Sequence, residues 1–402
     1  MGNDYDRLAQ YFQTYPGTTA LTSDPAVLSA AASSFASELH DLDESLTTLN
    51  PDVVAENLTR SVAILARRFG WSRSIAVRFA PADLPRVRDL PATTQHFTCV
   101  VRVAGEIGFD IVVNSSFFRV GNLRLLTRIP VLVWLFGRAL EREPRLVADF
   151  TCLLGDPGFW PVVSFSACHE AACLIPDSEF FASGGYSHFR DQTTETTPWK
   201  SRIRQVFWRG STSGIKRYWP PTGPGDLHWL PRLDLCTRAQ APDLANICDV
   251  GITTLVQVPP DHIASAASRI ATLMRPPVEK ASFAQFKAVI DIDGNSNAWS
   301  GLFTSLLSGA CVIKIESELG FRQWYYDRLE PWVHYVPVKA DLSDFDEKVR
   351  FVLSNDDAAH AIAEAGCRFA REMDFAAEIF TAADRLIAWT RDGHVSDGGR
   401  PA

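Results

Sequence analysis

The chain has 402 residues, of which 46% are hydrophobic and 21% are charged, and its formal net charge is −8. This composition is typical of a soluble globular protein, and the length favours two domains of about 150 to 200 residues each. The negative charge argues against a nucleic-acid-binding surface. The polar, acidic start MGNDYDRLAQYF is not a secretion signal, and the longest apolar run, Ile129 to Phe136, is too short to span a membrane.

The eight cysteines form no C-x-x-C pair, and several lie in or beside apolar runs. This usage fits reduced thiols in a cytosolic protein. Cys168 and Cys173 flank His169 and Glu170, so a metal site is conceivable there. We nevertheless expect no metal.

In chain order, the sequence predicts a weakly docked arm over residues 1–22, a helical segment, and then short strands separated by turns. The predicted helices of this half cover residues 24–42, 52–68 and 123–143. The predicted strands cover residues 74–79, 96–103, 109–113, 146–154 and 161–166. Residues 175–200 are polar and contain Gly184-Gly185, which indicates a long loop leading to a hinge between domains.

The second half begins with an apolar run from Arg204 that leads into the turn Gly210-Ser-Thr-Ser-Gly214. We expect residues 230–236 to return to the sheet, and residues 250–258 form a further apolar run. Helices are predicted at residues 342–353, 358–371 and 375–389, followed by a frayed tail at 392–402.

The stretch from Lys287 to Val338 has the pattern of a βαβαβ unit. Its predicted strands are residues 287–292, 311–315 and 332–338, and its predicted helices are residues 299–307 and 321–329. This order implies a parallel sheet with right-handed crossovers, in which ligands lie beyond the carboxyl ends of the strands. The loop from Asp293 to Ala298 lies at that edge and opens a helix, so it predicts binding of a phosphate-bearing ligand.

Two further positions are candidates for chemistry. Asp156 follows a predicted strand on the loop Gly155-Asp-Pro-Gly158, where an α/β protein can expose a base. Asp-Pro-Gly is also ordinary turn chemistry, so a purely structural role remains open. Arg209 and the small hydroxyl residues after it can hold a phosphate, although such turns are common in other contexts.

Several segments together resemble glycosyltransferase family 90. They are FWRGSTSG, PRLDLC, DVGIT, FKAVIDIDGNSNAWSGLFTSLLSGACVIK and WYYDRLEPWVHYVPVKADLSD. The resemblance covers roughly Phe150 to Arg371. The wording DGNSNAWSGLF followed by GFRQWYYDRLEPWVHYVPV looks most like the bacterial branch of that family.

The resemblance implies an α/β fold with two facing Rossmann-like domains, the type-B glycosyltransferase architecture, after an N-terminal helical extension. Residues 23–200 would form the acceptor-side domain, residues 201–372 the nucleotide-sugar-binding domain, and residues 373–391 a helix packing back on the first. It also implies inverting chemistry that needs no metal or other cofactor, because helix N-termini and cationic side chains neutralise the diphosphate.

Carried over residue by residue, the resemblance makes Asp156 the general base. It assigns donor binding to Arg209, Gly210, Ser211, Ser213, Asp293, Gly294, Asn295, Ser296, Asn297, Trp299, Glu316 and Arg322. The family's eukaryotic members place an Arg in the helix after the donor loop, where this chain reads Ser300-Gly301. Arg322 is the nearest substitute in the sequence, and a surface role on an amphipathic helix is its alternative.

We therefore expect an inverting transferase that moves a hexose or pentose, from UDP-glucose or UDP-xylose, to a saccharide or lipid-linked saccharide of a capsule, lipopolysaccharide or related surface glycan. The expected location is cytoplasmic, with peripheral contact at the inner membrane face, and no nucleic-acid partner. A non-catalytic nucleotide- or glycan-binding protein on the same fold is the alternative. A Rossmann dehydrogenase is excluded because no G-x-G-x-x-G turn is present.

Overall fold

A computed structural model describes Val54, Leu58, Thr59 and residues 73–80, 97–114, 123–156, 158–193, 197–218, 220–223 and 225–391. The expected arm, nearly all of the N-terminal helical extension and the expected tail lie outside the described residues. The chain divides into two compact units, residues 1–185 with 374–402, and residues 186–373. Among the described helices, none combines the length and apolar character needed to cross a bilayer.

The first unit is built on a six-stranded sheet in the order β1-β3-β2-β4-β5-β6. Its strands are β1 Ser74–Ala80, β2 Thr98–Ala104, β3 Gly108–Asn114, β4 Val147–Leu153, β5 Val163–Ser164 and β6 Cys173–Leu174. Strand β2 runs antiparallel to β3 and β4, whereas the other neighbours are parallel. A wholly parallel sheet is impossible here, because the 3-10 turn Gly105–Ile107 is too short for a crossover from β2 to β3.

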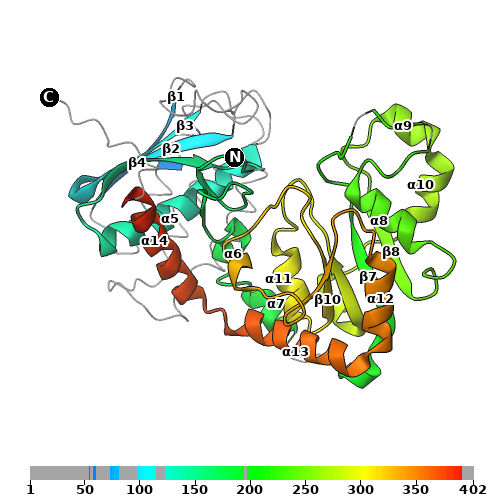
Figure 1. The fold of residues 1–402 in the computed structure, drawn as a ribbon. Coiled ribbons are helices and arrows are strands. Elements are labelled where there is room, and N and C mark those ends of the chain that lie inside the picture. The colour runs from blue at the N-terminus through cyan, green and yellow to red at the C-terminus, as the bar shows by residue number, and fades with distance from the viewer. Residues whose placement is uncertain are drawn as a thin grey trace, which may run out of the picture. The chain divides into compact units, whose positions relative to one another are not determined.

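Two long helices pack together in this unit. Helix α5, Ile129–Arg142, is buried at every residue from Ile129 to Leu140, after the 3-10 turn Leu123–Arg128. Helix α14, Phe375–Arg391, follows the second unit in sequence but lies beside α5 (Figure 1). Phe375 contacts Trp134 of α5 with ring centroids 5.7 Å apart, and Trp389 Nε1 donates to the Ala171 carbonyl at 2.8 Å. A short helix α6, Ser178–Ala182, completes the unit.

The second unit contains the parallel sheet that the βαβαβ pattern predicts. Its order is β11-β10-β9-β7-β8, and every neighbouring pair is parallel. The strands are β7 Ile203–Ser211, β8 Cys248–Thr254, β9 Phe286–Asp291, β10 Cys311–Ile315 and β11 Val336–Val338. Every residue of β9 and β10 is buried, so helices or loops cover both faces there. The α/β class is confirmed.

Helices cover the second sheet from both sides. The helices of this unit are α7 Ser187–Gln192, α8 Pro231–Ala239, α9 Pro260–Ser265, α10 Ala267–Leu273, α11 Ser300–Leu307, α12 Phe345–Ser354 and α13 Asp356–Glu372. Apolar residues of α8, α10 and α12 share one core with alternate residues of the strands, such as Ile290 and Ile313. Helix α11 packs against β9, β10 and α13, and Figure 1 shows α11 and α12 on opposite sides of β10.

Two predictions about this unit are wrong. Residues 230–236 do not enter the sheet, because Pro231 begins α8 and Leu233, Cys236 and Ala239 are buried at helical spacing. Residues 321–329 form only a 3-10 turn, Tyr326–Arg328.

The boundary between the units also differs from the one predicted, since it falls at Gly185 and not at residue 200. Tyr186 packs on Phe303 of α11 with ring centroids 4.9 Å apart, which attaches the segment after Gly185 to the second unit. That segment is not one long loop, because it contains α7 and a 3-10 turn, Trp199–Ser201.

Candidate functional site

The strand order of the second unit creates a crevice at the carboxyl ends of β7 and β9. From β7 the chain moves outward to β8 and then returns past β7 to form β9, β10 and β11 on its other side. This reversal is a topological switch point, the place where open α/β sheets bind ligands. Arg209, Gly210 and Ser211 end β7, and Asp291 ends β9.

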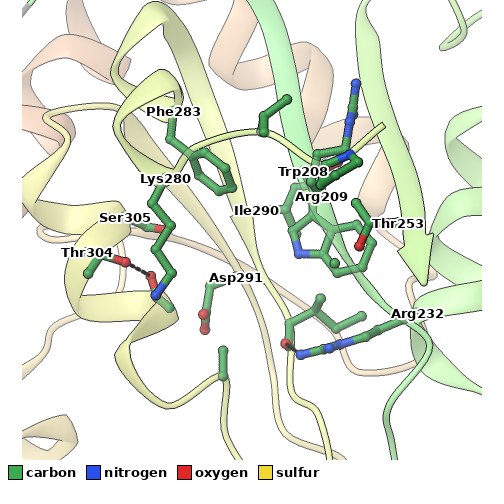
Figure 2. A pocket seen from close by; sticks show the side chains of 16 residues that line it. Trp208, Arg209, Arg232, Thr253, Lys280, Phe283, Ile290, Asp291, Thr304 and Ser305 are labelled. Atoms are coloured by element: carbon green, nitrogen blue, oxygen red, sulfur yellow. Dashed lines mark hydrogen bonds between the residues drawn. The ribbon is translucent and has the colours of Figure 1, made fainter. Parts of the chain in front are cut away.

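A first cavity of about 300 Å³ lies at this switch point (Figure 2). Its walls come from the ends of β7, β8 and β9, from the start of α11 and from the 3-10 turn Lys280–Gln285. Figure 2 shows the polar ends of Lys280 and Asp291 near the start of α11, with Arg232 reaching in from the other side. Three cations and one carboxylate line the cavity: Arg209, Arg232, Lys280 and Asp291.

Arg209 is held by the neighbouring strand. Its Nη2 lies 2.7 Å from Asp249 Oδ1, and its Nη1 donates to the carbonyls of Asp249 and Trp208 at 2.8 and 2.9 Å. The guanidinium also lies over the Phe207 ring, 4.5 Å from its centroid. Asp249 therefore has a defined role, which is to orient Arg209 and compensate its charge.

Arg232, the second residue of α8, ties two loops together. It donates to the Ile292 and Asp293 carbonyls at 3.1 and 2.9 Å, and to Ser213 Oγ at 2.9 Å. A longer contact of 3.3 Å reaches the Ser211 carbonyl. Burial lowers the Arg232 pKa, while Asp291 and Asp293 act in the opposite direction. The side chain thus fixes the ends of β7 and β9 relative to each other.

Asp291 and Lys314 form a buried ion pair beneath this edge. They are register partners on β9 and β10, and Lys314 Nζ lies 3.1 Å from Asp291 Oδ2. Burial acts to lower the Lys314 pKa, but Asp291 and then Asp293 outweigh it and raise the pKa overall. The ammonium also lies 4.8 Å from the centroid of the Tyr326 ring.

A second cavity, of about 140 Å³, shares Ile292 with the first. Asp293, Gly294, Ser296 and Glu316 line it. Burial raises the pKa of Asp293 to about 6, although Lys314 and a hydrogen bond from Ser317 oppose the shift. The loop after β9, residues 293–299, therefore contains a carboxyl group whose pKa is raised toward neutral pH.

Hydrogen bonds hold the remaining part of the loop after β9. Gln257 Nε2 donates to Asn295 Oδ1 at 2.9 Å, and Gln257 Oε1 accepts from the Gly214 backbone N–H at 3.0 Å. Asn297 Nδ2 donates to the Phe321 carbonyl at 3.1 Å. Trp299 has a φ of 52°, an unusual value for a bulky residue, just before α11. The loops after β7, β8 and β9 are thus coupled.

The structure separates the expected donor-binding residues into groups. Arg209 and Gly210 line the first cavity. Asp293, Gly294, Ser296 and Glu316 line the second. Ser211, Ser213, Asn295, Asn297 and Trp299 shape the loops around them. Arg322 lines neither cavity, and its Nη1 lies 3.2 Å from Asp327 Oδ1, so its expected role near the diphosphate gains no support.

Sequence reasoning missed four residues that the structure places at this edge: Arg232, Lys280, Asp291 and Lys314. Asp291 and Lys314 each interrupt an apolar strand near its carboxyl end, in VIDID and CVIKI. Opposite charges at matching strand positions were the available signal for that pair. Arg232 and Lys280 reach the site from α8 and a 3-10 turn, and no local pattern marks them.

Asp156 lies in the first unit, on the loop after β4. Its Oδ1 is 3.8 Å from Arg128 Nη1, and its side chain is 21% exposed. The same Arg128 nitrogen donates to the Leu154 carbonyl, and the guanidinium lies over the Phe165 ring. Burial lowers the Arg128 pKa, with Asp156 and Asp177 opposing that shift. The carboxylate is therefore partly accessible and has a cation beside it.

The cysteine pair around His169 and Glu170 is arranged differently from a metal site. Cys168 Sγ donates to the Gly158 carbonyl at 3.6 Å, and His169 Nδ1 accepts from the Ala171 N–H at 3.1 Å. Burial raises the pKa of the Cys173 thiol to about 12. Within the described part of the chain, no three His, Cys, Asp or Glu residues are grouped as metal ligands.

Two proteins similar to this chain are named protein O-glucosyltransferases. Protein O-glucosyltransferase 1 of Bos taurus is 46% identical over 281 residues, which cover 68% of this chain and 60% of that protein. Protein O-glucosyltransferase 2 of Danio rerio is 30% identical over 176 residues, 43% of this chain and 29% of that protein. The chain thus spans less than two thirds of the length of these relatives.

Among solved structures, that of WaaG, a glycosyltransferase involved in lipopolysaccharide biosynthesis, aligns with 84% of this chain and 85% of its own. The TM-score of this alignment is 0.33, and the two sequences are 12% identical. Residues 253–381 match the family model of Glycosyl transferase family 90. These residues include β9, β10, α11 and Lys280, so much of both cavity walls comes from the part of the chain that matches this family model.

Proposed function

We propose that the protein is a glycosyltransferase that takes a sugar from a nucleotide sugar bound at the carboxyl edge of the second sheet. The observation that carries this proposal is the first cavity, in which Arg209, Arg232 and Lys280 surround a switch-point crevice inside or beside the family 90 region. A cationic crevice at a helix N-terminus suits a diphosphate. The O-glucosyltransferase names of the relatives support the same class of reaction.

The diphosphate is the leaving group in this proposal, so its negative charge must be stabilised as the bond to the sugar breaks. The N-terminal end of α11 and the cations of the first cavity supply that stabilisation. Catalysis by these groups requires no metal ion. The hydroxyl-bearing part of the donor then lies toward the second cavity, where Asp293, Ser296 and Glu316 offer hydrogen-bond acceptors.

Asp156 is the proposed general base. Its Oδ1 lies 3.8 Å from Arg128 Nη1, and a carboxylate is the form of the side chain that can accept a proton. The acceptor hydroxyl loses its proton to Asp156 while its oxygen attacks the anomeric carbon of the donor. The bond from that carbon to the diphosphate oxygen breaks, and the nucleoside diphosphate departs with the electron pair. Attack from the face opposite the leaving group inverts the configuration.

The proposed donor is UDP-glucose or UDP-xylose, and the relatives' names favour glucose. The proposed acceptor is a saccharide or lipid-linked saccharide of a capsule, lipopolysaccharide or related surface glycan, used at the cytoplasmic face of a membrane. The wording of the donor loop and of residues 320–338, which resembles the bacterial branch of the family, supports this choice of acceptor.

A panel of nucleotide sugars tests the proposal. A donor at about 100 times its dissociation constant should stabilise the folded chain by about 2.7 kcal/mol in thermal unfolding. Release of nucleoside diphosphate from the same donor then separates an enzyme from a non-catalytic binding protein on this fold. One observation favours the non-catalytic alternative, which is that Arg209 is already paired with Asp249. Binding without any turnover, with acceptors supplied, would favour it.

A further inference from the structure

We infer that Lys280 is the side chain that contacts the phosphate groups of the bound nucleotide in the first cavity. This inference rests on the proposed function and assigns a role that the sequence motifs left unfilled. It concerns one residue, at the start of the 3-10 turn before β9, which neither local pattern nor strand position marks as functional.

The cations of the first cavity differ in the partners that already engage them. Arg209 is paired with Asp249 at 2.7 Å, and the donors of Arg232 are used by carbonyl and hydroxyl oxygens. Asp291, the carboxylate in the lining, is paired with Lys314 at 3.1 Å. Lys280 forms no ion pair with any carboxylate of the described residues. Within the same part of the chain, Arg232 also has no carboxylate partner, but its donors are engaged by these neutral oxygens, whereas the Lys280 ammonium makes one hydrogen bond, to Ser300. An anion that enters the cavity therefore meets in Lys280 a cation with donors left to bind it.

The ammonium group of Lys280 lies at the start of α11. Lys280 Nζ donates to Ser300 Oγ at 2.8 Å, and Ser300 is the first residue of α11. The N-cap residue of α11 is Trp299, whose side chain has no oxygen to accept from the helix N–H groups. The ammonium therefore lies at a helix end that still favours an anion. A phosphate here would receive donors from both the helix and the lysine.

The start of α11 borders the first cavity at a glycine. Gly301 lines the cavity, and a Cβ atom added there would lie 2.9 Å from the Ala298 Cβ. The glycine is therefore required by its close contact with Ala298, and it places no side chain over the first turn of α11 where that turn lines the cavity. Lys280 is held on its other side by Phe189, whose ring centroid is 4.7 Å from Nζ. This cation–π contact limits the directions in which the ammonium can move.

Lys280 can change partners at low cost. The bond to Ser300 joins a charged donor to a neutral hydroxyl, whereas a phosphate offers a charged acceptor, and bonds between two charged groups are the stronger ones. The ammonium is compact and sits on a flexible stem, so it can follow the phosphate as charge develops on it. We expect Lys280 to contribute to binding and, more strongly, to departure of the leaving group.

The test compares Lys280→Met and Lys280→Arg with the parent chain by calorimetric titration with UDP and with uridine. Lys280→Met should weaken UDP binding about tenfold to a hundredfold without changing the affinity for uridine. Lys280→Arg should retain most of the UDP affinity. The control is Lys200→Met, which removes the same charge from an exposed position. Lys200 lies just before the start of β7, whereas the first cavity lies at the carboxyl end of that strand.

The outcomes separate this inference from the function on which it rests. If Lys280→Met binds UDP as tightly as the parent chain, the inference is overturned and the proposed function stands. If the parent chain binds no nucleoside diphosphate at all, both are overturned. Should Lys280→Met fold poorly, Lys280→Gln keeps a polar side chain of similar length and must show the same selective loss. Equal losses for UDP and uridine would mean a structural role and would also overturn the inference.

Discussion

Arg209 and Asp249 form an ion pair of 2.7 Å between the neighbouring parallel strands β7 and β8. The resemblance to family 90 assigns Arg209 to the donor, yet the structure shows its charge already opposed by a carboxylate. The positive potential that Arg209 contributes to the cavity therefore depends on how far Asp249 offsets its charge, and a mutation of Asp249 can change that potential.

Asp249→Asn keeps a hydrogen-bond acceptor for Arg209 but removes the opposing charge. We predict that the variant binds UDP about two- to tenfold more tightly, because the net potential of the first cavity becomes more positive. Arg209→Ala should weaken UDP binding instead. Titration of both variants at low and high salt checks this, since the gain in Asp249→Asn should shrink as salt rises. Weaker UDP binding by Asp249→Asn would contradict the charge balance.

The buried pair of Asp291 and Lys314 should be costly to break. Lys314→Met leaves Asp291 as an unpaired buried charge, so we predict a loss of about 3–5 kcal/mol in the free energy of unfolding. The double variant Asp291→Leu/Lys314→Met should recover much of this loss, because it leaves neither charge behind. Urea unfolding of the parent chain, both single variants and the double variant gives the coupling energy. Additive losses would show that the pair is not coupled.

Asp293 should make stability depend on pH in a defined direction. Its folded pKa is raised to about 6 from 3.8, so the native state binds a proton more tightly than the unfolded state does. This stabilising contribution is complete below pH 4 and is lost as pH rises through about 6. The full span corresponds to about 3 kcal/mol.

Asp293→Asn removes this titration, so it should be more stable than the parent chain above pH 6 and gain little below pH 4. Urea unfolding of both proteins between pH 4 and pH 8 measures the difference. The matched control is Asp243→Asn, because Asp243 lies on an exposed turn and pairs with Arg350 at the surface. A stability difference for Asp293→Asn that stays constant over this pH range would rule out the raised pKa.

Asp156→Asn should lower the transfer rate by about 10² to 10⁴-fold and leave the affinity for UDP nearly unchanged. The amide keeps the shape of the side chain but cannot accept the acceptor's proton. Single-turnover transfer together with UDP titration measures the two effects separately. Unchanged transfer in this variant would remove Asp156 from the mechanism, whereas a parallel loss of UDP binding would indicate a structural role.

The second sheet was predictable because its signals are local. The runs at Lys287 to Ile292 and Cys311 to Ile315 are apolar and β-branched, and a glycine turn lies at one end of each, Gly294 after the first and Gly309 before the second. Strands β9 and β10 lie within a residue of the expected positions. Helices α12, α13 and α14 were predictable too, because their apolar residues recur at helical spacing. The predicted parallel sheet is confirmed in the second unit, and a cavity lies at the edge where ligand binding is predicted.

The failures have a common physical cause. Pro231 begins α8 although the residues around it resemble a strand, because buried positions at helical spacing decide the local structure. Residues 321–329 have an aromatic helical pattern, yet the backbone of Phe321 is held by side chains outside the segment. Its N–H donates to Ser317 Oγ, and its carbonyl accepts from Asn297 Nδ2. Lys280 and Arg232 reach the first cavity through tertiary contacts. Such positions are set by packing between distant segments, which a single sequence does not display.

The most direct test of the account is the release of UDP from UDP-glucose by the full chain, measured with and without a mixture of saccharide acceptors. We predict that the parent chain releases UDP and that Lys280→Met and Asp156→Asn each suppress this release. Lys280→Met should do so with weaker UDP binding, and Asp156→Asn without it. If the chain neither binds nor cleaves any UDP-, GDP- or dTDP-sugar at millimolar concentration, the proposed donor site is wrong.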